Sequence, residues 1–334
     1  RFRGYDVVQL INPVFLELKA ERIMPFYKYL RRNNGKVVLG AFGMDYYWVQ
    51  VNTELLPLRY SDFNMGERLR HDEEAERFRR ELLGTPKARL CQQVAEDCDG
   101  IVAGLYEYWA TYDAVPSLRR KLTFIPYPVK VPDSQCGQDG HGAQTVQCNQ
   151  TIPCDQTALC DQTIQGNQTI QDGLPARPLR LFVGISRNRS AYKGTDIMLA
   201  AAQAVQAKYP DRLEIQIAEG VPFAQYQRMM DASDAILDQL YSYTPAMNAL
   251  LAMSKGIINI GGGEPENYEI LGEKELRPII NVEPNYENCC HEIEQLVLHP
   301  ERVAELKRQS VEYVRRHHDY VKVAGEYLKF YEGV

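Results

Sequence analysis

Short apolar runs alternate along the chain with segments whose apolar residues recur at helical spacing. Each apolar run ends in a polar or glycine-containing loop, which is typical of buried strands in a parallel sheet. Strands are predicted over 5–11, 36–42, 100–103 and 122–129, and then over 179–185, 213–218, 235–240, 257–260 and 277–282. Helices are predicted between them, including a charged surface helix within 60–80 and a last helix over 311–331. Strand alternating with helix indicates an α/β fold with parallel sheets that helices cover on both faces.

Two predicted strand ends within the stretch 234–269 present a polar loop and a glycine-rich loop. The strand 235–240 leads into the loop 241–245, and the strand 257–260 leads into Gly261-Gly262-Gly263 and the acidic run Glu264-Pro265-Glu266. In an open α/β sheet, ligands bind beyond the carboxyl ends of the strands. We therefore expect a ligand site where these two loops meet.

A polar segment divides the chain into two α/β series, and 334 residues are enough for two domains. We predict a first Rossmann-like domain over 1–133, an insert over 134–176, a second Rossmann-like domain over 177–310 and a terminal helical segment over 311–334. Two such domains predict a cleft between them. The first has only four predicted strands, and the earliest begins almost at residue 1. We therefore expect that the opening βα units of this domain are absent from the chain.

The insert repeats with a period of six: GAQTVQ, CNQTIP, CDQTAL, CDQTIQ and GNQTIQ follow one another from Gly142. A β-solenoid needs apolar ladders over several coils, and these repeats offer one small apolar residue each. Thiolate ligation of a metal by Cys148, Cys154 and Cys160 is a second alternative, but their spacing matches no common zinc pattern. The composition favours a polar, disordered insert.

The composition of the chain limits the classes of partner that it is expected to bind. The net charge is −6, so there is no global basic field that would recruit nucleic acid. No apolar run approaches the roughly 18 residues that a membrane span needs. The chain carries no secretory mark, so we expect a cytoplasmic protein whose eight cysteines are free thiols. The glycosylation sequons at Asn149, Asn167 and Asn188 are then coincidental.

The second half resembles the donor-binding domain of GT-B nucleotide-sugar glycosyltransferases, in their large retaining group 1, family 4-like class. The resemblance lies in GISRNRSAYKGTD, IQIAEGVPFAQYQRMMDASDAILDQ and LLAMSKGIINIGGGEPE, which stand in the order of that family's motifs. FIPYPV resembles the strand that ends the first domain of the family. The helix 313–331 resembles the terminal helix that crosses back to that domain. The resemblance covers the chain outside 134–176.

The resemblance implies a nucleotide-sugar donor, a polysaccharide or lipid-linked acceptor, transfer with retention, and a peripheral contact with the inner face of a membrane. In the family an Arg and a Lys hold the donor diphosphate, and Arg187 and Lys193 match them. Their charges suit a leaving group that becomes negative, and no Asp-x-Asp pair in a suitable loop suggests a metal or other cofactor. The candidate catalytic residues are Arg187, Lys193, Glu264 and Asp45. The candidate donor-binding residues are Gly184, Arg187, Lys193, Glu219, Tyr243, Asn248, Gly262, Gly263, Glu264 and Glu266.

We expect Arg187, Lys193 and the segment 262–266 to line one wall of the cleft. The helix that follows Lys193, capped by Thr195, would add its amino-terminal dipole to the diphosphate site. Glycines at 261–263 would let the backbone approach the donor closely. His317 and His318 are expected on a helix surface, and Trp48 and Trp109 in the core.

Two departures from the family pattern leave alternatives open. The family's Glu-x7-Glu falls on Tyr243 and Leu251, and leucine cannot bond the donor ribose. The family's histidine in the first domain falls near Gly43, with Asp45 beside it. A non-catalytic nucleotide-sugar-binding relative, acting as a partner subunit, is therefore the alternative to an enzyme. A sugar epimerase of the same architecture is a third reading, which would need carboxylates and a His facing the anomeric carbon.

Overall fold

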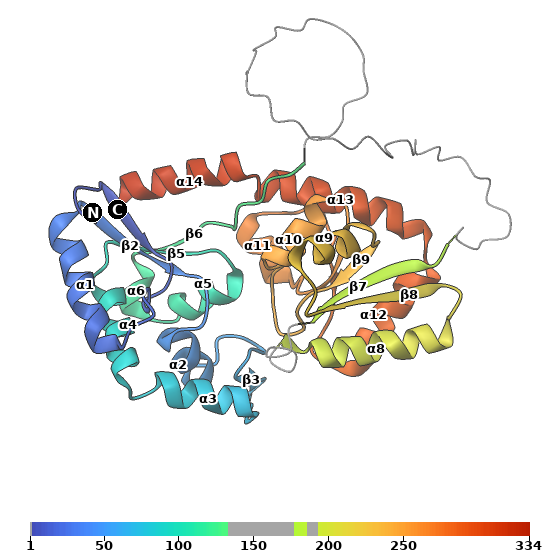
Figure 1. Ribbon diagram of the computed structural model, residues 1–334, viewed down its shortest axis with the longest axis horizontal. Helices are drawn as coiled ribbons and strands as arrows, with labels where there is room; N and C mark the ends of the chain where they lie inside the picture. Colours follow the sequence, from blue (N-terminus) through green and yellow to red (C-terminus); the bar gives the residue numbers. More distant parts are fainter. Residues whose placement is uncertain (1, 133–176, 186–192) are drawn as a thin grey trace, which may run out of the picture.

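The computed structural model describes residues 2–132, 177–185 and 193–334 (Figure 1). The hexapeptide repeats and Arg187 lie outside the described residues. The predictions about them therefore stay predictions. Within the described ranges, none of the helices combines the length and the apolar character that a bilayer crossing requires.

The first domain is built on a four-stranded parallel sheet with the order β1-β2-β5-β6. Its strands are β1 (Val7–Leu10), β2 (Lys36–Ala41), β5 (Gly100–Ala103) and β6 (Leu122–Phe124). Its helices are α1 (Ala20–Asn33), α2 (Tyr46–Glu54), α3 (Glu73–Leu82), α4 (Pro86–Asp97), α5 (Tyr106–Asp113) and α6 (Pro116–Arg119). The four strands predicted for this half are confirmed: β5 has the predicted bounds, and β1, β2 and β6 are shorter than the apolar runs indicated.

The second domain has a five-stranded parallel sheet with the order β11-β10-β9-β7-β8. Its strands are β7 (Leu179–Ile185), β8 (Leu213–Glu219), β9 (Ala235–Leu237), β10 (Ile258–Gly261) and β11 (Ile280–Asn281). Its helices are α8 (Thr195–Lys208), α9 (Phe223–Asp231), α10 (Met247–Ser254), α11 (Pro265–Leu271) and α12 (Tyr286–Leu298). The five predicted strands are confirmed.

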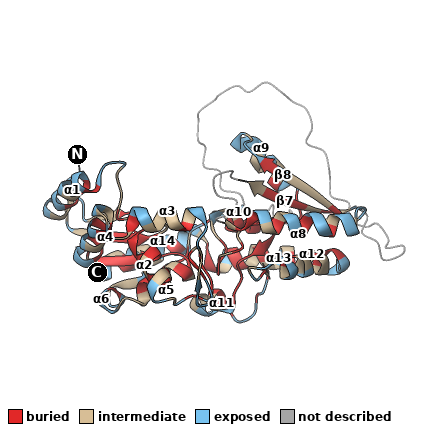
Figure 2. Ribbon diagram, turned by 90° about the horizontal axis from the view of Figure 1, so that it is seen from below, coloured by how far each residue is buried: buried red, intermediate tan, exposed pale blue. Residues whose placement is uncertain are grey.

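The sheet of the second domain is covered on both faces, as its continuous apolar strands require. Neighbouring side chains on a strand point to opposite faces. On β7, Leu181 and Val183 pack in one cluster with Met198 of α8 and with α12, whereas Phe182 packs in another with Met230 of α9 and with α10. Figure 2 shows this buried layer continuing through both domains, with exposed residues on the outer helix faces.

The chain ends in two helices, α13 (Glu301–His317) and α14 (Tyr320–Gly333), where the sequence predicted one. The break occurs because Asp319 starts a new helix, its side chain accepting hydrogen bonds from the backbone of α14. Figure 1 shows α14 reaching from the second domain to the first. There Val323 and Phe330 pack against the first sheet. The crossing expected from the family resemblance is therefore present.

His317 and His318 lie at this break and are buried, so the expectation of a surface position was wrong. His317 Nε2 lies 2.6 Å from a carboxylate oxygen of Glu273. His318 Nδ1 lies 2.9 Å from the backbone oxygen of Tyr127, and burial lowers the pKa of His318 to about 4. The two rings pack at the point where the chain passes from the second domain to the first. The helical spacing of apolar residues in the sequence does not reveal that this point is buried.

The segment predicted as a surface helix within 60–80 is helical only from Glu73. Before it lies a small antiparallel hairpin of β3 (Asn64–Met65) and β4 (Arg68–Leu69). Arg59, Tyr60 and Arg70 in and around this hairpin contact the second domain. Charged residues here therefore form part of the domain interface.

Candidate functional site

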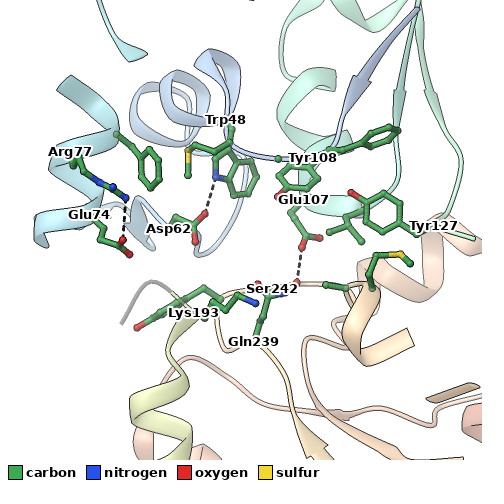
Figure 3. Close-up of a pocket in the computed structure, with 18 of the residues that line it drawn as sticks. Trp48, Asp62, Glu74, Arg77, Glu107, Tyr108, Tyr127, Lys193, Gln239 and Ser242 are labelled. Carbon is green, nitrogen blue, oxygen red and sulfur yellow. Dashed lines mark hydrogen bonds and ion pairs between the residues drawn. The ribbon is translucent and has the colours of Figure 1, made fainter. Parts of the chain in front are cut away.

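A cavity of about 860 Å³ lies between the two domains. Its walls come from the carboxyl ends of strands in both sheets and from the helices that follow them. Figure 3 shows Trp48, Glu107 and Tyr108 on the first-domain side and Lys193, Gln239 and Ser242 on the second-domain side. The predicted cleft between two α/β domains is therefore confirmed, and it has the position at which such sheets bind ligands.

Lys193 lines the second-domain wall directly before α8. We predicted that Thr195 caps this helix, but the cap is Gly194, whose φ of 69° lies in the left-handed region that favours glycine. A side chain at Gly194 would also meet Leu240, whose backbone N–H donates to the Lys193 carbonyl at 2.9 Å. These contacts hold the start of α8 against the loop after β9. The Lys193 ammonium and the α8 amino terminus are thereby placed together, a combination that suits an anion.

Asp238 lies under this wall and is buried. Burial raises the pKa of the Asp238 carboxyl, and the Lys193 charge opposes that shift. Lys193 therefore lies close to a buried carboxyl at the end of β9.

Glu107 is a cavity residue that the sequence analysis did not single out. It lies on α5 just after β5, and its carboxylate oxygens lie 2.7 Å from the hydroxyl groups of Ser242 and Thr244 in the other domain. The Ser242 hydroxyl also lies 2.7 Å from the Thr244 carbonyl oxygen. The Ser242 hydroxyl donates to ionised Glu107; a protonated Glu107 can instead donate to Ser242, whose own proton then reaches the Thr244 carbonyl oxygen. Burial raises the Glu107 pKa to about 7, with hydrogen bonds from both hydroxyls opposing it.

The first-domain wall combines aromatic rings with carboxylates. Trp48 Nε1 donates to Asp62 at 2.9 Å, and the Trp48 and Tyr108 rings meet edge to face with centroids 5.0 Å apart. Arg77 and Glu74 form an ion pair at 3.2 Å on the same side of the cavity (Figure 3). Aromatic faces beside hydrogen-bonding carboxylates are suited to a ligand that has both C–H surfaces and hydroxyl groups. Trp48 is buried, as expected of a core residue, yet it also reaches the cavity.

Asp45 lies just behind this wall. Its neighbours Gly43 and Met44 line the cavity, but Asp45 itself is turned into the domain as the amino-terminal cap of α2. Its carboxylate accepts from the Trp48 backbone N–H at 2.9 Å and from the Tyr112 hydroxyl at 2.6 Å. Burial raises the Asp45 pKa to about 6 despite these hydrogen bonds. Both carboxylate oxygens thus have partners within the first domain.

The glycine-rich loop after β10 packs against other segments of the same protein. A Cβ at Gly262 would lie 2.2 Å from the Ser242 backbone oxygen, and one at Gly263 would lie 2.6 Å from Ile279. The glycines therefore let the loop 241–246 pack closely against this one. Lys193 lines the cavity, whereas 262–266 are not among its lining residues. Arg187, the third part of the expected wall, lies outside the described residues, so the common wall stays a prediction.

Glu264 and Glu266 of this loop bind the first domain. The Arg59 guanidinium donates to Glu264 at 2.7 Å and also pairs with Glu266. The Tyr60 hydroxyl donates to the other Glu264 oxygen at 2.7 Å, and Asn281 donates to the same oxygen at 3.1 Å. Glu264 is buried among the three residues that donate to it, and in this structure it links the two domains.

Tyr243 occupies the space between the domains. Its ring stacks on Tyr60 with centroids 4.6 Å apart, and the Arg59 guanidinium lies 5.1 Å from the ring centre. Tyr243 is 1% exposed and packs in a hydrophobic cluster of the first domain. The residue in the position of a family glutamate therefore joins the interface.

The remaining candidate residues lie around the second sheet, outside the lining of the cavity. A side chain at Gly184 would meet Tyr226, whose hydroxyl donates to Asn248 at 3.2 Å. Glu219 is the exposed last residue of β8, and Leu251 packs against the cluster beneath α10. Within the described part of the chain, no group of His, Cys, Asp or Glu side chains is placed to hold a metal ion.

Sequence reasoning pointed to Gly43 and Asp45 at the first-domain half of the cavity but missed most of its lining. Glu107 and Tyr108 lie in the first turn of α5, and Asp62 lies shortly before β3; none of the three stands in a motif. The only available signal was general: Glu107 lies shortly after a predicted strand, at the sheet edge where ligands bind. Ser242 belongs to the predicted loop 241–245 and Gln239 to the end of the strand predicted over 235–240, but neither was a candidate site residue.

Comparison with known proteins identifies the architecture. No protein-family model and no curated protein matches the sequence. Solved structures do match: HepE from Anabaena in complex with UDP-glucose has a TM-score of 0.56 at 9% identity, covering 98% of this chain and 79% of HepE. Sucrose-phosphate synthase from Thermosynechococcus elongatus has a TM-score of 0.55 at 13% identity, covering 99% of this chain and 74% of the synthase.

A TarM variant from S. aureus, in complex with fondaparinux, α-GlcNAc-glycerol and UDP, has a TM-score of 0.52 at 9% identity. The match covers 93% of this chain, which spans only about half, 54%, of the TarM chain. At such low identity, the structural similarity is evidence for the fold alone. The chain has the two-domain α/β architecture of the GT-B glycosyltransferases, with both of its parallel sheets facing one interdomain cavity.

Proposed function

We propose that this protein binds a nucleotide-sugar donor in the interdomain cavity and transfers the sugar to a saccharide or lipid-linked acceptor. One observation carries the proposal: Lys193, at the start of α8, faces an aromatic and acidic first-domain wall across a cavity of about 860 Å³. UDP-glucose is present in the HepE structure, and UDP in the TarM structure, that share this fold. We carry that ligand class over to this chain as part of the proposal.

The proposed chemistry places the donor diphosphate at Lys193. As the bond to the sugar breaks, negative charge builds on the diphosphate, and the ammonium group and the amino-terminal end of α8 stabilise it. Arg187 remains the predicted second cation, outside the described residues. The donor is expected to be held without a metal, and retention at the anomeric carbon is an expectation from the family resemblance.

The acceptor is assigned to the first-domain wall. The rings of Trp48 and Tyr108 offer apolar faces for the C–H side of a sugar, and Asp62 and Glu107 offer acceptors for hydroxyl groups. Glu107 has a second role, because its bonds to Ser242 and Thr244 hold the two walls together. A carboxyl with a pKa near 7 can also exchange a proton close to neutral pH.

A second candidate function is donor binding without sugar transfer. Tyr243 and Leu251 stand where the family has carboxylates, and Glu264 and Glu266 are engaged by Arg59. No carboxylate of the glycine-rich loop is thus free to bond the donor sugar in this conformation. These contacts are the observation that makes a nucleotide-sugar-binding partner subunit the second candidate.

Calorimetric titration with a panel of nucleoside diphosphates tests the proposal. Lys193→Ala should weaken binding by about 1.5–3 kcal/mol, as expected for the loss of a charge-assisted bond. Lys208→Ala is the matched control, because Lys208 lies at the other end of α8 and pairs with Glu294 on the surface. Addition of EDTA should leave the affinity unchanged. Equal affinity of wild type and Lys193→Ala would overturn the diphosphate assignment.

The two candidate functions separate in a second assay. Wild-type protein is incubated with nucleotide sugars, with and without saccharide and lipid-linked acceptors, and the released nucleoside diphosphate is measured. Release that Lys193→Ala lowers supports the transferase. Diphosphate binding without release on any donor and acceptor supports the non-catalytic relative.

A further inference from the structure

Asp238 is a buried carboxyl to which the proposed chemistry gives no role. It directly follows β9, and its backbone N–H donates to the Ile260 carbonyl of β10 at 3.0 Å, so it stands at the carboxyl edge of the second sheet. Asp238 is 7% exposed, and its Oδ2 atom is buried without a hydrogen-bond partner among the residues that the structure describes. A buried polar atom without a partner is rare in folded proteins and requires a specific explanation, such as a bound water or a role toward a ligand.

The groups around this carboxyl belong to the lining of the interdomain cavity. The Gln239 side chain and the backbone N–H of Ala246, which lies directly before α10, hydrogen-bond to the Asp238 carboxyl. Both residues line the cavity, and so does Lys193, whose charge acts on Asp238. The Asp238 carboxyl therefore lies beneath the cavity wall that carries Lys193.

The titratable groups that act with Asp238 come from three other elements. Lys193, directly before α8, supplies a positive charge. Tyr226 of α9 is the second group: burial, and to a smaller extent the Asp238 charge, raise the pKa of its phenol. Glu107 of α5 also lines the cavity, and burial raises its pKa to about 7. Any pH dependence of the cavity must therefore be separated between Asp238 and Glu107.

A diphosphate at Lys193 and an ionised Asp238 oppose each other. The diphosphate places negative charge against the same ammonium group that acts on the buried carboxyl. Like charges close together disfavour the ionised form of a carboxyl, most strongly where water is excluded. A protonated Asp238 removes this repulsion and turns the carboxyl into a hydrogen-bond donor.

We propose that Asp238 couples the binding of a diphosphate in the cavity to the uptake of one proton, so that the neutral carboxyl admits the anion and the ionised carboxyl repels it. The inference rests on the proposed function, since it takes Lys193 as the diphosphate site. The proton comes from solvent and returns to it when the diphosphate leaves. Asp238 thereby sets how tightly the anion is held at a given pH.

The direction of the pH dependence follows from the charges. Burial already raises the Asp238 pKa in the free protein, and the Lys193 charge opposes that shift. A bound diphosphate occupies Lys193 and adds like charge, so the Asp238 pKa is higher still in the complex. Affinity is therefore greatest below the pKa of the free protein, falls as the pH rises to that of the complex, and is level above it. The fall is about tenfold for each pKa unit between the two.

Calorimetric titration with a panel of nucleotide sugars, between about pH 5 and about pH 8, tests the inference. The diphosphate of a nucleotide sugar keeps its charge over this range, so the pH dependence belongs to the protein. Glu107→Gln is the parent, because it removes the other titrating carboxyl of the cavity. We expect the parent to lose about tenfold or more in affinity toward high pH. Adding Asp238→Asn should abolish this loss and keep the low-pH affinity throughout. Titrations in two buffers of different ionisation enthalpy should show proton uptake by the parent and none by the Asp238→Asn variant.

The matched control is Asp234→Asn at the other end of β9. Asp234 is buried and paired with Arg177 and Lys307, and its pKa of about 2 keeps it ionised over the whole range. Its replacement should leave the pH dependence of binding unchanged, and circular dichroism should show that every variant is folded. Sulfate, whose charge is also constant, is a second probe that needs no nucleotide, with Lys193→Ala as the blank.

The outcomes separate this inference from the proposed function. Sulfate binding at Lys193 with the expected pH dependence, without binding of any nucleotide sugar, would support the proton coupling and overturn the proposed function. Nucleotide-sugar binding with the same pH dependence in the parent and in Asp238→Asn would overturn the coupling alone, as would weaker binding by Asp238→Asn at high pH. Absence of proton uptake by the parent overturns the coupling whether or not Asp238→Asn folds. Failure of both probes to bind would overturn both proposals.

Discussion

Replacing Glu107 with glutamine should make the protein more stable at alkaline pH. Burial raises the Glu107 pKa from 4.5 to about 7, so the folded state holds a proton that the unfolded state releases between these values. Stability should therefore fall as the pH rises from about 4.5 to about 7 and then stay level. At about 1.4 kcal/mol for each pKa unit, ionised Glu107 costs up to about 3 kcal/mol at pH 8. The glutamine amide can donate to Ser242 and accept from Thr244, as the protonated acid does.

Urea unfolding followed by tryptophan fluorescence measures this effect. Both tryptophans of the chain, Trp48 and Trp109, lie in the first domain near Glu107, so their emission reports on the relevant part. We expect Glu107→Gln to match wild type near pH 5 and to exceed it by about 1–3 kcal/mol at pH 8. Asp45 titrates in both proteins and cancels in the difference. A difference that does not change with pH, or a less stable variant at pH 8, would refute the reasoning.

Three further changes test the contacts that hold the fold. Gly262→Ala should lower the free energy of unfolding by about 2 kcal/mol or more, because its Cβ would meet a backbone oxygen at 2.2 Å. Gly325→Ala, in open space on α14, should raise it by up to about 1 kcal/mol. Urea unfolding measures both variants. Arg59→Ala should lower the free energy of unfolding in urea by about 1 kcal/mol, and lysine there should restore less than half of it, because it lacks a forked donor. Arg177→Ala should destabilise by about 1 kcal/mol at pH 7. That deficit should shrink in thermal melts between pH 4 and 2, where Asp234, whose pKa lies at about 2, becomes protonated.

The strands and their parallel order could be predicted because their signal is local and strong. β7 follows the apolar run 179–185 residue for residue, and β9 and β10 are each followed by the polar and glycine-rich loops expected at strand ends. The break before α14 could not be predicted in this way. It depends on the cap at Asp319 and on a tertiary position for His318, and the helical pattern continues across both.

The site was predicted in part for the same reason. Lys193 lies on a motif next to a helix start, so sequence alone could place it at the edge of the sheet. Glu107 reaches the cavity only because its domain faces the other one, and its partners Ser242 and Thr244 are more than a hundred residues away. Arg59 lies next to a charged segment that the sequence predicts to be on the surface. Its engagement of Glu264 depends on the same packing of domains, which no local pattern encodes.

Tyr243, which the family resemblance aligns with a glutamate, is held in the interface by its neighbours. The Tyr243 ring fills the interface between Tyr60 and the loop that carries Glu264, and its hydroxyl accepts from the Tyr60 backbone N–H at 3.3 Å. A glutamate restored at this position alone would bury a further carboxylate within a site that already holds Glu264 and Glu266, with Arg59 as the cation that neutralises them. Burial of an unpaired charge lowers the stability of the fold by several kcal/mol, about as much as many surface contacts together contribute. The position therefore serves the domain interface in this chain, and under the proposed function the donor sugar would be bound by the groups that line the cavity: Lys193, Gln239, Ser242 and the carboxylates across from them.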